Sequence, residues 1–101
     1  MYQKKRLELI IEKPAFKRAC RVLEGAGVTG YTALPCMAGY GGGKRWQRGN
    51  DLSASRDMVM IVSILDEDIL ENIILKIENL IGSHIGIISV GSVEVIRDDR
   101  F

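Results

Sequence analysis

Apolar and polar residues alternate near the start of the chain, over residues 5–12. Leu7, Leu9 and Ile11 fall on one face of this segment, and most of the other face is charged. A period of two residues is typical of a strand with one buried face. Residues 56–65 have the same period, but both of their faces are largely apolar. Such a strand is usually central and covered on both sides, so its second face calls for a partner subunit.

Two other segments have the period of a helix. In residues 15–24, and again in residues 66–81, apolar side chains recur three and four positions apart. Asp66 is a candidate N-cap, and the two acids after it suit the positive end of a helix dipole. We expect Gly25 and Gly82 to end these helices.

Two further strands are predicted at residues 28–34 and 86–97. The last one is interrupted at Gly91 and Ser92, which indicates a bulge or a place where another backbone or a ligand comes near. The order strand, helix, strand, strand, helix, strand predicts an α+β fold. This is the ferredoxin-like βαββαβ arrangement, a four-stranded antiparallel sheet with two helices on one face. We interpret residues 1–101 as one domain whose open sheet faces pack together in about three copies.

Composition and charge narrow the possible functions. The chain is 47% hydrophobic and 27% charged, which is ordinary for a globular domain. Its net charge of +1 argues against general nucleic-acid binding. The charge is uneven, however: residues 1–56 carry eleven Lys and Arg against four Asp and Glu, and residues 57–101 carry three against nine. This distribution favours either an anionic ligand near the first half or pairing of the two halves.

The sequence has no pattern of a signal peptide and no apolar run of about 18 residues that would span a membrane. Cys20 and Cys36 lie in different predicted elements and lack metal-ligand spacing. His84 is the only histidine, so we expect neither a metal site nor a catalytic role for it. These features predict a cytoplasmic protein with reduced thiols, at most indirectly associated with a membrane.

A glycine-rich loop joins the second and third predicted strands, over about residues 36–56. Six of the eleven glycines lie between residues 30 and 49, together with the only tryptophan, Trp46. Three basic side chains follow the glycines: Lys44, Arg45 and Arg48. Backbone N–H groups made accessible by glycine, beside basic side chains, favour an anion site. The alternatives are a solvated charge run or a target-docking surface, and we expect no regular structure here.

Three features together resemble the P-II signal-transduction proteins. These are the run Gly-Ala-Gly-Val-Thr-Gly-Tyr-Thr at residues 25–32, the long loop after it, and the ending Val-Glu-Val-Ile-Arg-Asp-Asp-Arg-Phe at residues 93–101. The ending is similar to the short P-II-like branch associated with bicarbonate uptake and carboxysomes. The resemblance covers nearly the whole chain. It implies a homotrimer with an adenine nucleotide in each cleft between subunits, and a T-loop that changes shape to regulate a partner.

The resemblance also implies the residues of the site. The nucleotide-binding positions are Gly30, Tyr31, Thr32, Gly39, Gly41, Lys44, Arg45, Gly86 and Arg97. The positions in the T-loop that would contact bicarbonate or a target are Gly42, Gly43, Trp46 and Arg48. Arg97 is preferred to Arg100, which is better explained as part of a solvated tail.

The chain departs from the family's Gly-x-Gly-Lys phosphate loop at two positions. His84 stands at the first glycine and Ile87 at the lysine, and only Gly86 matches. Loss of the lysine predicts weak binding of a triphosphate, so ADP or AMP is preferred to ATP. The resemblance further implies bicarbonate as a ligand, no catalytic cofactor, and a bicarbonate transporter or carboxysome component as partner.

Other functions remain open on the sequence. A nitrogen-type P-II regulator would respond to ATP and 2-oxoglutarate, and Gln47 is present in the loop. A metal-tolerance trimer of the same fold needs clusters of His, Cys or Asp. A small phosphate hydrolase needs a supported nucleophile, and the loop offers only Asp51, Ser53 and Ser55 without a histidine. We therefore expect a regulator with no catalytic residues.

Overall fold

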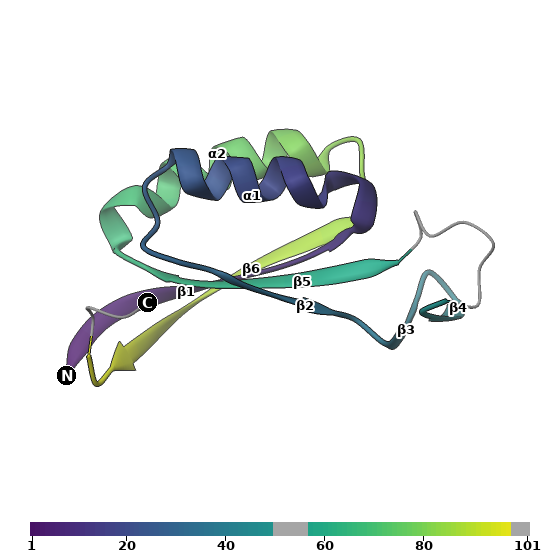
Figure 1. The fold of residues 1–101 in the computed structure, drawn as a ribbon, viewed down its shortest axis with the longest axis horizontal. Coiled ribbons are helices and arrows are strands. Elements are labelled where there is room, and N and C mark those ends of the chain that lie inside the picture. The colour runs from purple at the N-terminus through teal and green to yellow at the C-terminus, as the bar shows by residue number, and fades with distance from the viewer. Residues whose placement is uncertain (50–56, 98–101) are drawn as a thin grey trace.

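A computed structural model of the chain describes residues 1–49 and 57–97. Four antiparallel strands form one sheet in the order β2-β5-β1-β6. They are β1 (Tyr2–Glu12), β2 (Thr32–Pro35), β5 (Met58–Leu65) and β6 (Gly86–Val95). Helices α1 (Phe16–Gly25) and α2 (Glu67–Ile81) both cover the same face of this sheet, and the other face is open (Figure 1). The predicted ferredoxin-like fold is confirmed.

The core lies between the sheet and the two helices. Leu7, Leu9 and Ile11 are at most 1% exposed, as the alternation of β1 predicted. The buried positions of the other elements have the same periods: Val59, Ile61, Ser63 and Leu65 from β5, Ala19, Cys20 and Leu23 from α1, and Ile73 and Ile77 from α2. Burial of each leucine or isoleucine contributes about 1.5–3 kcal/mol to folding.

The end of α1 differs from the prediction. Gly25 is the last helical residue, and the left-handed conformation falls two residues later, at Gly27 with φ of 88°. The N–H of Gly27 donates to the carbonyl of Glu24 at 3.2 Å, and the N–H of Val28 donates to the carbonyl of Leu23 at 3.3 Å. These two bonds form a Schellman cap, which needs a residue with positive φ at this position.

The cap explains why β2 begins later than predicted. The alternation suggested a strand over residues 28–34, but the pairing with β5 covers only Thr32–Pro35. Val28 is used in the cap and does not join the sheet. Residues 26–31, between α1 and β2, therefore lie outside the sheet.

Two further expectations need correction. Strand β6 ends at Val95, so Arg97 lies beyond the strand. There is no bulge at Gly91 and Ser92, because these residues pair in unbroken register with Arg6 and Lys5 of β1.

The second helix begins and ends where predicted. Asp66 occupies the N-cap position but makes no capping hydrogen bond with its side chain. Its carboxylate pairs with the ammonium group of Lys4. Gly82 follows the helix as its C-cap.

Some predictions fall on residues 50–56 and 98–101, which lie outside the described residues. They concern the second part of the T-loop, with Asp51, Ser53 and Ser55, the start of the third predicted strand at Arg56, and Arg100 in the C-terminal segment. Within the described ranges, no helix has the length and apolar character needed to cross a membrane.

Candidate functional site

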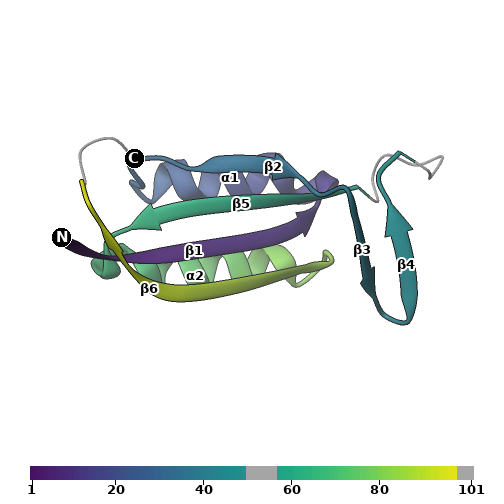
Figure 2. The same ribbon diagram turned by 90° about the horizontal axis from the view of Figure 1, so that it is seen from below.

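The glycine-rich loop contains a hairpin that projects beyond one end of the main sheet (Figure 2). Its strands are β3 (Ala38–Gly41) and β4 (Lys44–Gln47), which pair antiparallel. Gly42 and Gly43 form the turn, with φ of 57° and 76°. Positive φ at both central residues is typical of a type I′ turn, whose twist suits a two-residue hairpin. The expectation of an irregular loop is therefore wrong for residues 38–47.

The indole of Trp46 lies across Gly39 on the neighbouring strand. Gly39 and Trp46 are paired in the hairpin, and a Cβ atom on Gly39 would come within 2.3 Å of the indole ring. Only glycine leaves space for the ring in this position. The contact with Trp46 therefore explains why residue 39 is a glycine. Trp46 itself is half-buried.

Arg48 holds the base of the hairpin. Its N–H donates to the carbonyl of Met37 at 2.8 Å, and its guanidinium Nη1 donates to the carbonyl of Met58 at 3.2 Å. The same carbonyl of Met58 accepts the N–H of Cys36 at 3.0 Å, and Asp57 lies 3.9 Å from Arg48 Nη2. The backbone of Arg48 therefore joins the two arms of the loop, and its guanidinium ties them to the start of β5.

The thiol of Cys36 lies beside this junction. Burial raises the pKa of the Cys36 thiol, and the positive charge of Arg48 partly offsets that effect. Cys20 is buried in the core, as predicted, and both cysteines are free thiols.

The other basic side chains of the hairpin, Lys44 and Arg45, are exposed at its outer part. Gly41 precedes the turn, and a Cβ atom there would meet nothing within 4 Å. Unlike Gly39, it has no neighbour among the described residues that requires a glycine. Backbone N–H groups of a glycine turn beside basic side chains are a possible setting for an anion, so this turn stays the candidate anion site.

The segment before β2 is fixed from two sides. The hydroxyl of Ser63 in β5, which is fully buried, donates to the carbonyl of Gly30 at 2.7 Å. The hydroxyl of Tyr31 donates to the carboxylate of Glu24 in α1 at 2.5 Å. Thr32 follows as the exposed first residue of β2. These bonds set where the three predicted adenine-side residues lie.

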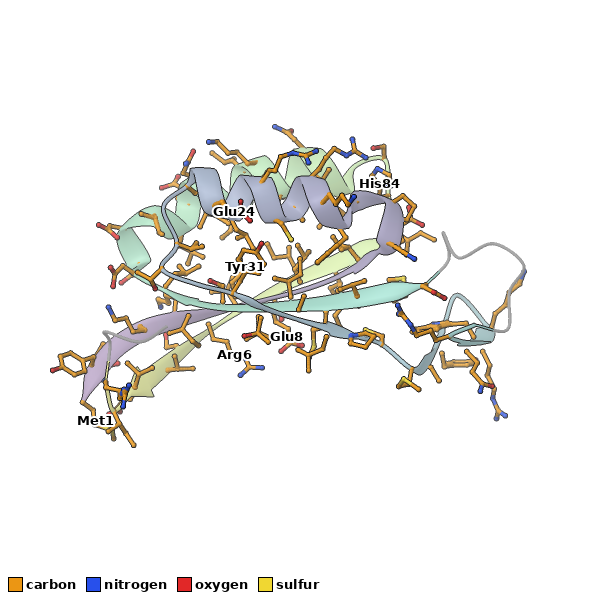
Figure 3. All side chains as sticks on the ribbon, viewed as in Figure 1. Met1, Arg6, Glu8, Glu24, Tyr31 and His84 are labelled. Carbon is orange, nitrogen blue, oxygen red and sulfur yellow. The ribbon has the colours of Figure 1, made fainter. Side chains whose placement is uncertain are left out.

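The bond to Glu24 changes the acidity of Tyr31. The pKa of the Tyr31 hydroxyl is raised, first by this hydrogen bond and further by the neighbouring Cys20 thiol. A negative phenolate beside the Glu24 carboxylate is disfavoured, so the proton is held more tightly. Tyr31 points toward the helices and away from the open sheet face, as Figure 3 shows.

Gly86 is required by the packing of the sheet. A Cβ atom at this position would come within 2.8 Å of Ile11 Cγ2 and 3.1 Å of the carbonyl of Ile10. Ile87, which stands where the resemblance has a lysine, is 63% exposed.

His84 lies just before β6 and contacts both β1 and α1. Its Nδ1 lies 2.9 Å from Oε1 of Glu12, and its Nε2 lies 2.5 Å from Nη2 of Arg18. Arginine can only donate, so Nε2 accepts and Nδ1 carries the proton that is donated to Glu12. The histidine therefore bridges β1 and α1. The described residues contain no group of three His, Cys, Asp or Glu that could hold a metal ion.

The predicted nucleotide-binding residues do not meet within one chain. Gly86 pairs with Ile11 at the end of β1, close to the base of the hairpin, whereas Arg97 follows the other end of β6. A strand rises about 3.3 Å per residue, so the two ends of β6 are roughly 30 Å apart. One nucleotide that uses both positions must therefore lie between copies of the chain.

Three residues of this region were not found from the sequence. Ser63 and Glu24 position the segment before β2, and Glu12 holds His84. The sequence offered one sign that Ser63 has a special role, because it is the only polar residue on the buried face of β5. Nothing in the sequence pattern pairs Glu24 with Tyr31.

A ferredoxin-like sheet with a long hairpin-bearing loop between its second and third strands is the architecture of a P-II-like protein. The family model described as nitrogen regulatory protein P-II matches residues 4–100, and the chain belongs to this family. No curated protein matches the chain.

Solved structures agree with this assignment. CPII, a nitrogen regulatory PII-like protein from Thiomonas intermedia K12, bound to ADP, AMP and bicarbonate, is 25% identical with a TM-score of 0.84. CPII bound to ADP and bicarbonate is 26% identical with a TM-score of 0.81, and each match covers 95% of this chain and 91% of CPII. A PII-like signaling protein from Thermus thermophilus is 21% identical with a TM-score of 0.75, over 93% of this chain and 90% of the other.

Proposed function

We propose that this chain is a PII-like regulatory protein that acts by binding and has no catalytic activity. It assembles as a homotrimer and binds an adenine nucleotide in each cleft between subunits, with ADP or AMP preferred to ATP. Bicarbonate is its second ligand. Residues 36–56 change conformation with these ligands and contact a cytoplasmic partner in inorganic-carbon metabolism, either a bicarbonate transporter or a carboxysome component.

The similarity to CPII carries this proposal. The CPII structures contain ADP and bicarbonate, and one also contains AMP. Their likeness extends over the sheet, both helices and the loop region, because 95% of this chain is covered. Fold alone does not give function, so the proposal also needs support from the residues of the site.

The separation of the predicted residues supports a site between subunits. Gly86 and the hairpin belong to one end of the sheet, and Arg97 belongs to the other. In a cyclic trimer, two different surfaces of neighbouring subunits meet, so residues that are far apart in one chain can line one cleft. Gly86 with Lys44 and Arg45 would then come from one chain, and Arg97 from the next.

The preference for ADP or AMP follows from the charge around Gly86. An exposed apolar side chain, Ile87, occupies the place where a lysine would hold outer phosphates. Arg48 is engaged at the base of the hairpin, which leaves Lys44 and Arg45 as the exposed cations of the described part of the loop. A third phosphate adds negative charge without a matching cation beside Gly86. For bicarbonate, the turn of Gly42 and Gly43 offers N–H groups next to these two cations.

The experiment is isothermal titration of the purified chain with ADP, AMP and ATP, each with and without bicarbonate at matched pH and ionic strength. The mass of the sample in solution is determined first. We expect one nucleotide per chain in a trimer, tighter binding of ADP and AMP than of ATP, and tighter nucleotide binding when bicarbonate is present. Such mutual tightening is what two coupled sites require.

GDP and chloride are the controls in this titration. GDP tests whether the adenine base is recognised, and chloride tests whether the effect of bicarbonate is only one of ionic strength. Absence of binding by every adenine nucleotide would overturn the proposal.

A nitrogen-type regulator is the second candidate, because the matched family is described as nitrogen regulatory protein P-II. This function would require ATP, magnesium and 2-oxoglutarate, with Gln47 in the loop as a contact. The same titration distinguishes the two. Tight binding of 2-oxoglutarate in the presence of ATP and magnesium would favour this candidate, whereas the proposed function predicts no response to it.

A further inference from the structure

An ion pair lies on the open face of the sheet, opposite the helices. Arg6 and Glu8 are alternate residues of β1 and point away from both helices (Figure 3). Arg6 Nη2 lies 3.3 Å from Glu8 Oε2, and the side chains are 45% and 33% exposed. The strand β1 is central in the sheet, between β5 and β6. The pair therefore lies in the interior of this face and not at its edge.

The surroundings of the pair on β5 are apolar. Arg6 is directly opposite Ile64, and Glu8 is directly opposite Val62. Directly opposite residues of paired strands point to the same face. Met60 and Ile10 are paired next along the same face. A charged pair thus stands among apolar side chains that are only half-buried in one chain.

On the other side, β6 leaves space beside the pair. Arg6 is opposite Gly91, and Glu8 is opposite Ser89. A Cβ atom on Gly91 would meet nothing within 4 Å, and its φ is not positive. Glycine weakens a strand, and nothing in the described part of the chain requires it here. A small residue at this position is explained if a side chain from another molecule enters the space.

The proposed trimer places this face against two further copies of the chain. We propose that Arg6 of each copy pairs there with Glu8 of the next copy, above Gly91. The inference rests on the proposed function, because it assigns the contacts that hold the proposed trimer together. A head-to-tail contact that closes after three copies uses both charges of every chain. The occupant is another copy because the face carries both members of the pair and is self-complementary in charge.

This arrangement selects one way of packing the sheets. When the apolar face loses its water, an unpaired charge within it is strongly unfavourable, whereas a paired charge is tolerated. A shifted packing would place Arg6 against Val62 or Ile64 of a neighbour and leave its charge without a partner. The ion pair therefore acts against incorrect assemblies, while the apolar side chains supply the attraction.

Charge reversal tests whether Arg6 and Glu8 pair between copies of the chain. Arg6→Glu places two acids on the face, Glu8→Arg places two bases there, and the double variant Arg6→Glu/Glu8→Arg restores one of each. Sedimentation velocity gives the mass of each variant at one protein concentration and moderate salt, and circular dichroism reports its folding. We expect each single variant to lose the trimer at a concentration where the unchanged chain keeps it, and the double variant to regain it. Single variants that remain trimeric, or a double variant that does not reassemble, would overturn the exchange.

Gly91→Val gives an independent test that does not depend on charge. A valine fits within the single chain and favours a strand, so the isolated subunit keeps its fold. Ser92→Val, the next residue on the opposite face, is the matched control. We expect Gly91→Val to weaken assembly at least tenfold and Ser92→Val to leave it unchanged. Equal assembly of the two variants would refute the role of Gly91.

The two proposals fail in different ways. A trimer that responds to these substitutions but binds no adenine nucleotide supports the assembly contact and overturns the proposed function. A chain that binds ADP as a monomer overturns the assembly contact.

Discussion

The hydroxyl of Ser63 donates to the carbonyl of Gly30 at 2.7 Å, across 33 residues of sequence. Ser63 is the only polar residue among the buried side chains of the described core. The bond joins central strand β5 to the segment that leads into edge strand β2. This bond therefore both stabilises the sheet and positions Tyr31 and Thr32, which follow Gly30.

Ser63→Ala should therefore lower the free energy of unfolding by about 1 kcal/mol, because the half-buried carbonyl of Gly30 loses its donor. Urea unfolding at a fixed protein concentration measures the change. Ser83→Ala is the control, since Ser83 is exposed in the turn after α2. If both variants unfold at the same urea concentration as the unchanged chain, the bond does not contribute to stability.

Gly39→Ala should displace the indole of Trp46, because the added Cβ atom would lie within 2.3 Å of the ring. Overpacking of this kind costs about 1–3 kcal/mol, here as a local loss of hairpin structure. Trp46 is the only tryptophan, so its fluorescence reports on the hairpin directly. We expect emission at longer wavelength in Gly39→Ala and no shift in Gly41→Ala, where a Cβ atom meets nothing within 4 Å.

Gly86→Ala should destabilise the main sheet by about 1–3 kcal/mol, since a Cβ atom would press on Ile11 and on the carbonyl of Ile10. Thermal unfolding of the ligand-free chain measures this effect without any nucleotide. Gly25→Ala, at the end of α1 with open space around it, is the matched control. That control should be neutral or up to about 1 kcal/mol more stable. A normal unfolding temperature for Gly86→Ala would contradict the packing role.

The bond between Tyr31 and Glu24 should make stability depend on pH in alkaline solution. The folded chain holds the Tyr31 proton more tightly than the unfolded chain, because the pKa is raised in the folded state. The contribution is therefore complete below the unfolded pKa of about 10 and is lost as the pH rises above that value. Phenolate absorbance during an alkaline titration should show one tyrosine that ionises late.

Two variants assign that late ionisation. Tyr31→Phe should remove it from the titration, and Glu24→Gln should bring it back toward the usual range by removing the neighbouring charge. If Glu24→Gln leaves the titration unchanged, the charge of Glu24 is not the cause of the raised pKa.

The parts of the fold that depend on burial were predictable from the sequence. The periods of β1, β5 and both helices are visible because their buried and exposed faces differ in polarity, as Leu7 and Leu9 against Arg6 and Glu8 illustrate. The hairpin was missed because glycine has low strand propensity, although a pair of glycines between two short runs is a turn signal. The late start of β2 depends on a helix cap whose bonds are backbone only, so side-chain pattern does not report it.

The candidate site was less predictable than the fold. Glu24 and Tyr31 meet because the helix cap turns the chain back toward α1, and the sequence has no periodic signal for that contact. The predicted strand over residues 86–97 already implied that Gly86 and Arg97 lie at opposite ends, but only the register of β6 against β1 shows that the Gly86 end pairs with the end of β1. The periodicity of one chain does not indicate which residues of neighbouring copies would complete a site.

Thr32→Ala should weaken the binding of ADP about fivefold to tenfold while leaving the fold intact. Thr32 is exposed at the start of edge strand β2, so its hydroxyl is available to a base in the proposed cleft. Loss of one hydrogen bond of about 1 kcal/mol produces a change of this size. Titration calorimetry with ADP measures it, with Thr32→Ser as the variant that keeps the hydroxyl and Thr29→Ala as an exposed neighbour. Unchanged affinity in Thr32→Ala would remove Thr32 from the site, whereas equal losses in Thr32→Ala and Thr32→Ser would assign the effect to the methyl group.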